Sequence, residues 1–144
     1  MSQRHHTQNQ HMMLVTTNTE NRVDYFLRPP HAREAVECLY RIQHYNPFFL
    51  YAFVVMPDHC HFLLHVPEHG SVSRTMYMYK RAVSFAIGKP EWQGRFHLVI
   101  PRSVERTIGY IHSNPVRAGL CKSPQDYAWS SASGRWDVAE LPIM

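Results

Sequence analysis

Residues 54–66 restrict the fold more than any other stretch, and they read Val-Val-Met-Pro-Asp-His-Cys-His-Phe-Leu-Leu-His-Val. Two apolar runs flank a Pro-Asp turn, a pattern that predicts two strands paired as a hairpin. Successive side chains of a strand point to opposite faces, so His59 and His61 share one face and Cys60 points to the other. Two imidazoles on one rigid face can bind a divalent metal. Because the chain has eleven histidines, about one His-x-His pair is expected by chance, and a metal site needs further support.

Composition places the chain among ordinary globular proteins. Its 144 residues, 44% of them hydrophobic, suffice for one domain with an apolar core. The formal net charge of +4 is compatible with a polyanionic partner but does not identify one. Cys38, Cys60 and Cys121 are isolated, so neither a disulfide framework nor a cysteine zinc site is predicted, and a reduced, cytoplasmic location fits best. No apolar run reaches the roughly 18 residues that span a membrane.

The order of the expected elements predicts an α/β fold. Hydrophobic periodicity and turn residues indicate strands at 12–17, 48–56, 59–66 and 96–100, and helices at 29–46, from 71 or 73 to 87, and from 103 to 115. This β-α-β-β-α-β order with an extra helix is the ferredoxin-like arrangement, an antiparallel sheet with helices on one face and a further C-terminal helix. We expect one domain at 12–133, a flexible tail at 1–11 and a short C-terminal tail at 134–144.

A second set of residues lies on the last expected helix. Tyr110 and Asn114 are four residues apart and can share a helix face. A tyrosine hydroxyl can attack phosphorus and hold a covalent intermediate, and a metal held by His59 and His61 can neutralise charge on the phosphate. Asn114 offers an oxygen ligand suited to Mg²⁺ or Mn²⁺. Proline disrupts a helix interior, so Pro115 is expected to end this helix and to leave Asn114 at a frayed end.

These motifs together resemble a known family. Residues 56–64, Met-Pro-Asp-His-Cys-His-Phe-Leu-Leu, resemble the His-hydrophobe-His signature of the single-tyrosine transposases of the IS200 type. Three further motifs resemble the repeat-associated branch of that family: Trp-Gln-Gly-Arg-Phe-His at 92–97, Tyr-Ile-His-Ser-Asn-Pro-Val-Arg-Ala-Gly-Leu at 110–120, and Asp-Tyr-Ala-Trp-Ser-Ser at 126–131. The resemblance covers residues 12–133. Cys60 stands where a bulky aliphatic residue is common in the family, and cysteine is apolar enough to pack in a core.

The resemblance implies a ferredoxin-like enzyme that cleaves and rejoins single-stranded or hairpin DNA. It assigns the metal-ligand role to His59 and His61, a third-ligand role to Asn114 and the nucleophile role to Tyr110, with Mg²⁺ or Mn²⁺ as cofactor. The implied step leaves a 5′-phosphotyrosine and a free 3′-hydroxyl. Relatives of the IS200 type can share sites between two chains, whereas the repeat-associated branch can act as a monomer, so both a homodimer and a monomer remain open.

Other residues are weaker candidates. Five basic residues and one aromatic residue of the C-terminal half are candidates for DNA contacts, although solvated surface positions would explain each one individually: Arg95, Arg102, Arg106, Arg117, Lys122 and Trp92. The roles of His65, His97 and His112 stay open. Met76, Tyr79, Val83, Phe85 and Ile87 are expected to form the apolar side of their helix, and Tyr77 is expected to pack on the sheet.

Three alternative functions remain. The first is a related nicking enzyme, such as a replication initiator or a relaxase, with the same chemistry and another biological use. The second is a domesticated DNA-binding protein that has lost cleavage. The third is a metal-binding interaction module, which leaves the residues around Tyr110 unexplained.

Overall fold

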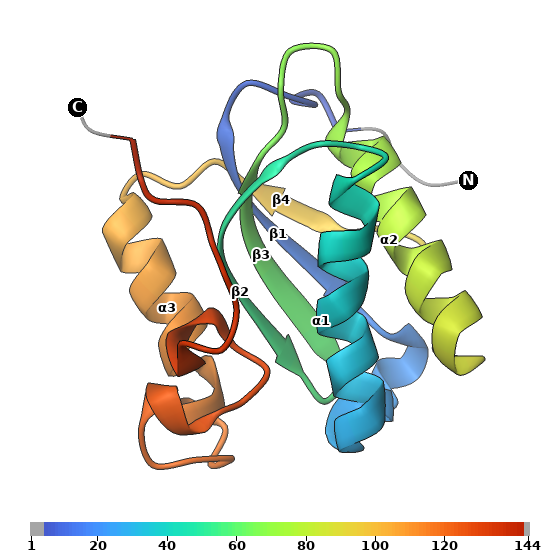
Figure 1. The fold of residues 1–144 in the computed structure, drawn as a ribbon, viewed down its shortest axis with the longest axis vertical. Helices are drawn as coiled ribbons and strands as arrows, with labels where there is room; N and C mark the ends of the chain where they lie inside the picture. Colours follow the sequence, from blue (N-terminus) through green and yellow to red (C-terminus); the bar gives the residue numbers. More distant parts are fainter. Residues whose placement is uncertain (1–4, 143–144) are drawn as a thin grey trace.

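A computed structural model describes residues 5–142 and contains a four-stranded antiparallel sheet (Figure 1). The strand order across the sheet is β2-β3-β1-β4, which is the ferredoxin-like order that the sequence predicts. The strands are β1 (Met12–Asn18), β2 (Phe49–Met56), β3 (His59–His65) and β4 (His97–Val99). β1 lies in the interior of the sheet and pairs with both β3 and β4.

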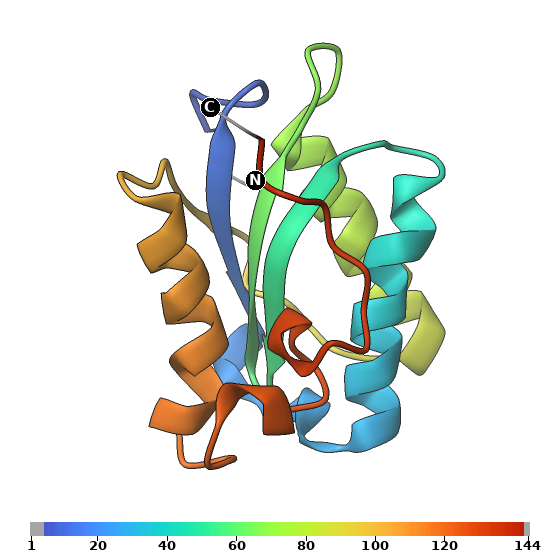
Figure 2. The same ribbon diagram turned by 60° about the vertical axis from the view of Figure 1, so that its left-hand side comes forward.

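Three helices cover the two faces of this sheet. They are α1 (Pro29–Gln43), α2 (Val72–Ile87) and α3 (Val104–Arg117). Figures 1 and 2 show α1 and α2 side by side on one face and α3 alone on the other. The predicted fold class is therefore confirmed. None of the helices within residues 5–142 is long and apolar enough to cross a lipid bilayer.

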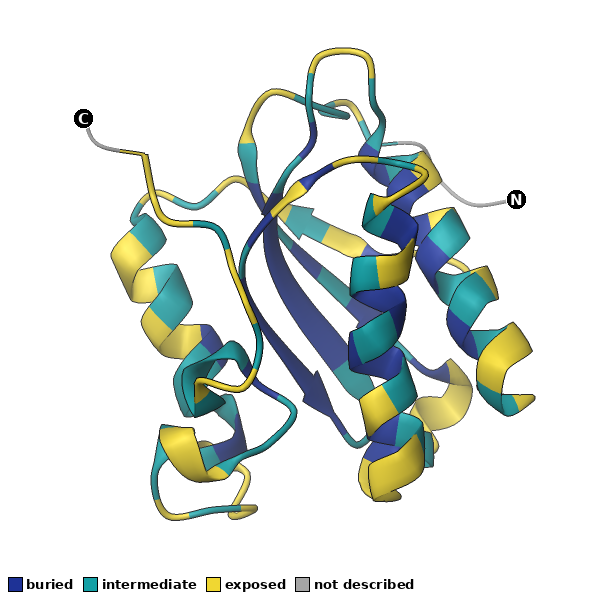
Figure 3. Ribbon diagram, in the orientation of Figure 1, coloured by how far each residue is buried: buried dark blue, intermediate teal, exposed yellow. Residues whose placement is uncertain are grey.

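The main apolar core lies between the sheet and the pair α1 and α2. In Figure 3 the residues coloured as buried lie along the central strands and on parts of these two helices. Strand alternation directs Val15, Cys60 and Phe62 into this core. The hydroxyl of Ser71 accepts a hydrogen bond from the Arg74 backbone N–H and caps the start of α2.

Three expectations about the helices are wrong. Tyr77, expected to pack on the sheet, is 58% exposed on α2 and belongs to neither apolar cluster. The other two concern Pro115 and Phe85. Pro115 does not end α3, which continues to Arg117. The proline is buried in the last turn, where the Asn114, Pro115 and Val116 carbonyls accept backbone N–H groups from residues 118–120, so burial and these bonds accommodate the proline. Phe85 does not join the apolar side of α2: it is 93% exposed, because it lies two residues, about 200° of helix rotation, beyond the buried Val83.

The segments at both ends of the domain lie against it. Within the predicted N-terminal tail, residues 1–4 fall outside the described part of the chain. The Gln8 side chain accepts hydrogen bonds from the Ser71 hydroxyl and the Ser73 N–H at the start of α2. At the other end, the Trp129 carbonyl accepts the Val55 N–H, and residues 129–139 follow the free edge of β2 (Figure 2). Flexibility of the N-terminal tail stays a prediction.

Candidate active site

The two histidines of the central motif lie on the sheet face that α3 partly covers. Strand alternation places both on the face opposite the main core, and their ring centroids are 4.9 Å apart, with the planes at 81°. His61 is buried, with 5% of its surface exposed, and His59 is half-buried. His65 shares this face but lies at the other end of β3, about 13 Å along the strand from His61 at 3.3 Å per residue. The face therefore presents a pair of imidazoles, not a row of three.

Tyr110 reaches the same place from α3. Its ring meets His61 edge-on, with 5.4 Å between centroids and an interplanar angle of 70°. The next residue, Ile111, is fully buried in a small apolar cluster between α3 and the sheet, together with Leu63 of β3, and it anchors the helix beside the histidines. The Tyr110 side chain stays 42% exposed. The Arg117 guanidinium carbon lies 4.6 Å from the centre of the Tyr110 ring, a cation–π geometry that holds the ring and brings a positive charge beside it.

Each histidine is oriented by a hydrogen bond at Nδ1. The Asp58 carboxylate lies 2.6 Å from His59 Nδ1 and accepts its N–H, and Arg22 Nε donates to the other carboxylate oxygen at 3.1 Å. The Thr16 hydroxyl lies 2.8 Å from His61 Nδ1. The Asp58 carboxylate can only accept, so His59 carries Nδ1–H and its Nε2 keeps a lone pair for a metal. The Thr16 hydroxyl can donate or accept, and in the tautomer in which it accepts from Nδ1–H, Nε2 of His61 is available to a metal as well. Arg22 has a φ of 55° and follows Asn21 with a φ of 56°, a left-handed conformation that arginine rarely adopts.

Electrostatics keep His61 in the neutral form that binds metals. Burial, then the neighbouring His59, Arg117 and Arg22, lower the pKa of His61 to about 4, so its imidazole is neutral at pH 7. Partial burial alone would raise the pKa of Asp58. The hydrogen bonds and charges of His59 and Arg22 outweigh that effect and hold the pKa of this carboxyl below its usual value. Asp58 therefore stays a carboxylate that can orient His59.

The donor set fits a divalent ion only in part. Within residues 5–142, no group of three or more histidine, cysteine, aspartate and glutamate side chains is gathered as a metal site. His59 and His61 provide two imidazoles whose Nε2 atoms can bind a metal in the Nδ1–H tautomer, and any third protein ligand must be of another type. Asn114 is half-buried and lies one helical turn beyond Tyr110 on the same face of α3. Its amide oxygen suits a hard ion such as Mg²⁺ or Mn²⁺, and its role as a ligand stays a prediction.

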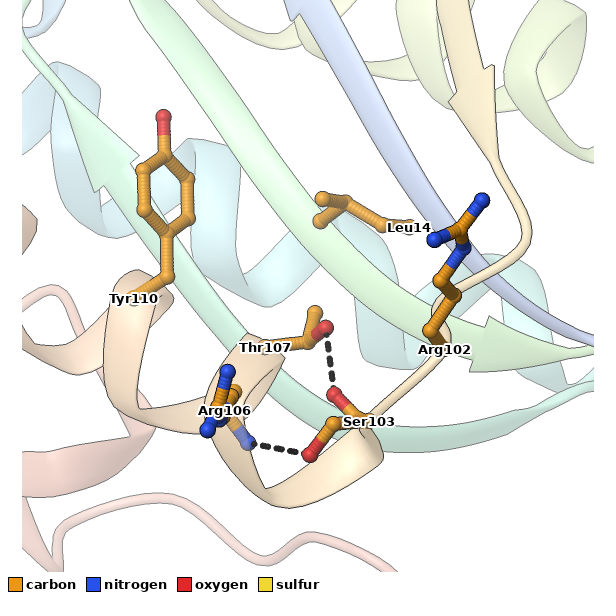
Figure 4. Close-up of a pocket in the computed structure, with 6 residues that line it drawn as sticks. All are labelled: Leu14, Arg102, Ser103, Arg106, Thr107 and Tyr110. Carbon is orange, nitrogen blue, oxygen red and sulfur yellow. Dashed lines mark hydrogen bonds between the residues drawn. The ribbon is translucent and has the colours of Figure 1, made fainter.

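A pocket of about 250 Å³ opens next to Tyr110 (Figure 4). Leu14 of β1 lines it from the sheet, and Arg102 and Arg106 line it from the start of α3. The pocket thus joins an apolar surface to two positive charges beside the tyrosine. Arg102 and Arg106 thus line the pocket that Tyr110 also lines, and Arg117 lies over the Tyr110 ring. A role of these three arginines in DNA contacts stays a prediction.

Other predicted contact residues lie elsewhere. Trp92 is half-buried against the main core, where its indole N–H donates to the Lys80 carbonyl and its ring lies 5.7 Å from Phe26, so the structure gives it a packing role. Arg95 is exposed in the segment before β4, and Lys122 is exposed beyond α3. Neither of these two residues lines the pocket beside Tyr110.

The two remaining histidines have different surroundings. His97 of β4 is exposed and lies opposite Thr16, which in turn lies opposite His61. His97 is therefore on the site face, about 10 Å from His61 at the usual spacing between strands. His112 of α3 lies with Nε2 2.7 Å from the Ser131 hydroxyl, a contact that ties α3 to the segment on the β2 edge.

Sequence reasoning missed the three residues that orient the histidines. Asp58 directly precedes His59, but the Pro-Asp pair by itself predicts only a turn. Thr16 is a polar residue in a β-prone run, and its period-two position predicts the face that it shares with His61 only once the pairing of β1 with β3 is known. Arg22 reaches Asp58 through a left-handed turn, and no local sequence pattern predicts that contact.

Comparisons with known proteins agree with this architecture. The model of the family described as IS200-like transposases matches residues 5–112. A REP-associated tyrosine transposase of Escherichia coli (strain K12) is 28% identical over 121 residues, which cover 81% of this chain and 73% of that protein. The solved structure of a REP-associated tyrosine transposase bound to a REP hairpin has a TM-score of 0.78 at 24% identity, over 99% of this chain and 93% of that one. A candidate transposase from Deinococcus radiodurans has a TM-score of 0.58 at 17% identity, over 83% of this chain and 98% of that one.

Proposed function

Because the chain belongs to the IS200-like transposase family, we propose that it cleaves and rejoins single-stranded or hairpin DNA through a covalent bond to Tyr110. The family that the motifs suggested is confirmed, and membership supports a DNA-processing activity. The matched residues include His59, His61 and Tyr110, whereas Asn114 lies beyond them.

The contact between Tyr110 and His61 carries this proposal. A hydroxyl-bearing ring from α3 and two imidazoles from β3 converge, although they lie far apart in the sequence. A tyrosine beside a pair of potential metal ligands suits phosphoryl transfer to the tyrosine oxygen. A structural tyrosine of a binding module would need neither the two adjacent imidazoles nor the guanidinium of Arg117 over its ring.

The proposed step balances without water or a nucleotide cofactor. The Tyr110 oxygen forms a bond to a backbone phosphorus, and the bond from that phosphorus to the 3′ oxygen breaks. Tyr110 loses one proton and the 3′ oxygen gains one, so the products are a 5′-phosphotyrosine and a free 3′-hydroxyl. Attack by a second 3′-hydroxyl reverses the step and joins two strands. His59 and His61, with Asn114 as a third ligand, would hold Mg²⁺ or Mn²⁺, which when bound would neutralise charge on the phosphate.

The DNA partner follows from the pocket and from the relatives. A solved relative is bound to a REP hairpin, and we propose a hairpin with an unpaired strand as the substrate here. The strand would enter the pocket beside Tyr110, with a sugar or base against Leu14 and phosphates near Arg102 and Arg106. Because Tyr110 lies against His61 of its own chain, we propose that one chain forms a complete site and that a dimer is not required. We also propose that the protein acts in the cytoplasm.

A Tyr110→Phe variant tests the proposal directly. Wild type incubated with Mn²⁺ and labelled hairpin DNA is expected to form an adduct that survives denaturing gels, and the variant is expected to form none while it still binds the hairpin. The matched control is Tyr45→Phe, which removes a hydroxyl from a tyrosine that is 83% exposed. An adduct in Tyr110→Phe contradicts the assignment, and the absence of any adduct in wild type favours a binding protein that has lost cleavage. Joining of a second strand distinguishes a transferase from a nicking enzyme.

A further inference from the structure

The outward side of α2 carries an unusual row of side chains. Arg74, Tyr77, Arg81 and Phe85 follow one another at spacings of three or four residues and therefore share one side of the helix. Tyr77 is 58% exposed and Phe85 is 93% exposed, whereas the opposite side of the helix is buried in the main core. We name these four residues the α2 stripe. Exposed aromatic residues that alternate with arginines call for an explanation, because exposure of large apolar rings to water is costly.

The charge of this region is also uncompensated. Residues 69–90 contain Arg74, Lys80, Arg81 and Lys89 and no acidic residue. Within residues 5–142, neither arginine of the stripe takes part in an ion pair, while Arg33 and Arg41 of α1 pair with glutamates of their own helix. The neighbouring helix thus neutralises its arginines and α2 does not. Unpaired cations on one helix side create a positive potential that attracts a polyanion.

The contacts within the stripe orient its side chains and leave most of the hydrogen-bond donors of its arginines available. Arg81 donates a hydrogen bond to the Tyr77 hydroxyl at 2.9 Å, and its guanidinium carbon lies 5.5 Å from the centre of the Tyr77 ring. A guanidinium has five N–H donors, so most of them remain for a phosphate. Arg74 and Phe85 lie about 16 Å apart along the helix at 1.5 Å per residue, which spans a few nucleotides.

We infer that the α2 stripe is a second contact surface for the same DNA molecule, one that binds an unpaired segment of the strand. The arginines would neutralise phosphates, and Phe85 and Tyr77 would offer flat faces on which unpaired bases stack. A second copy of this chain is a poorer occupant, because two positively charged stripes would repel each other. This inference rests on the proposed function, since it assumes that DNA is the partner.

The position of the stripe gives it a distinct role from the pocket beside Tyr110. α2 and α3 cover opposite faces of the sheet (Figures 1 and 2), so a short strand held at Tyr110 cannot also reach the stripe. A longer strand that passes around the sheet would contact both surfaces. Two linked contacts bind more tightly than either one because the second contact is intramolecular.

Binding of unstructured strands tests the inference, because stacking on aromatic rings tolerates any base. The probes are fluorescein-labelled dT30 and dT6, and the readout is fluorescence anisotropy of the full chain. Phe85→Ala is expected to weaken dT30 binding by about five-fold or more, because dT30 is long enough to contact both surfaces at once. It is expected to weaken dT6 binding by less, because dT6 contacts only one surface at a time, and Phe85→Trp is expected to restore the binding of both probes. The double variant Arg74→Gln/Arg81→Gln is expected to lower the slope of log affinity against log salt by about 1.4.

Two matched controls distinguish the stripe from general surface effects. Tyr45→Ala removes another strongly exposed aromatic ring, and Arg28→Gln/Arg33→Gln removes two exposed arginines near and on α1. If the stripe variants behave like these controls, the inference is wrong. It is equally overturned if Phe85→Ala lowers the molar mass in solution, because the stripe is then a contact between copies. The Tyr110 adduct assay is independent of these results. If wild type forms no adduct, the proposed function is rejected. If wild type forms the adduct but the stripe variants bind dT30 as tightly as wild type, only the inference about the stripe is rejected.

Discussion

The two faces of the sheet are built from the same strands and serve different purposes. The face toward α1 and α2 is continuous and apolar, and it contains Phe62 and Cys60 of β3. The face toward α3 has a smaller apolar cluster, and beside it the same strand contributes His59 and His61. Successive residues of one strand thus alternate between holding the fold together and forming the site. Because the candidate site and the main core occupy opposite faces, substitutions at neighbouring positions of β3 should separate effects on stability from effects on chemistry.

The largest expected effect falls on the face toward α3. His59→Ala or His61→Ala should abolish metal-dependent cleavage, because removal of one imidazole breaks the pair of Nε2 ligands, and the ion contributes several kcal/mol to charge neutralisation. Cleavage of labelled hairpin DNA with Mn²⁺ measures this loss. The matched control is Cys60→Ala, between the two histidines on the opposite face, which should retain cleavage when folded. Undiminished cleavage by either histidine variant in chelator would sink the metal hypothesis.

Substitution on the other face should reverse this outcome. Phe62 is fully buried, with its ring edge-on to Tyr79 at 5.0 Å. Phe62→Ala should therefore lower the free energy of unfolding by about 4 kcal/mol through lost burial and an internal cavity. Urea denaturation measures the change, and the folded fraction should still form the Tyr110 adduct. Val99→Ala, at a half-exposed position of β4, should change stability by less than about 0.5 kcal/mol. A stable Phe62→Ala protein that forms no adduct would refute the separation of the two faces.

A fall in pH should lower the free energy of unfolding through the protonation of His61. Its pKa in the folded chain is about 4, against an ordinary value of 6.5. Between pH 6.5 and 4, the unfolded chain binds a proton that the folded chain does not, so the free energy of unfolding should fall as pH falls. The full loss is about 3 kcal/mol, since one pKa unit corresponds to about 1.4 kcal/mol. Denaturation in chelator at pH 7 and pH 4 measures it. His61→Gln should lose less stability over this range, and an equal loss in both proteins would contradict the assignment.

Much of this arrangement follows from local patterns in the sequence. The alternation around Cys60 predicts which face each histidine occupies, and the spacing of α3 predicts that Tyr110 and Asn114 share a side. The expectations that were wrong concern residues whose positions depend on tertiary contacts. Pro115 continues α3 because the fold buries it, and Phe85 is exposed although its type favours the core. The Arg22–Asp58 contact requires a left-handed turn and a partner on another strand, and neither is encoded by periodicity.

The smallest expected effects compare the two residues that orient the histidines. Asp58→Asn keeps the shape of the side chain but removes the negative charge of the carboxylate whose oxygen accepts His59 Nδ1–H. Loss of such a partner typically weakens metal binding about 10- to 100-fold. Thr16→Val removes a neutral partner of His61, worth about 1 kcal/mol and so about five-fold. Titration of Mn²⁺ followed by electron paramagnetic resonance measures both.

Metal-free imidazole ¹⁵N spectra provide a second readout of the same pair. Wild type should show Nδ1–H on both rings, because Asp58 and Thr16 are positioned to accept that proton. Asp58→Ala should change the proton position of His59 alone, and Thr16→Val that of His61 alone. A purely structural role would shift both rings in both variants. If Asp58→Asn binds Mn²⁺ as tightly as wild type and Asp58→Ala leaves the His59 spectrum unchanged, Asp58 does not orient the ligand. The charged partner then gives His59 no advantage over the neutral partner of His61.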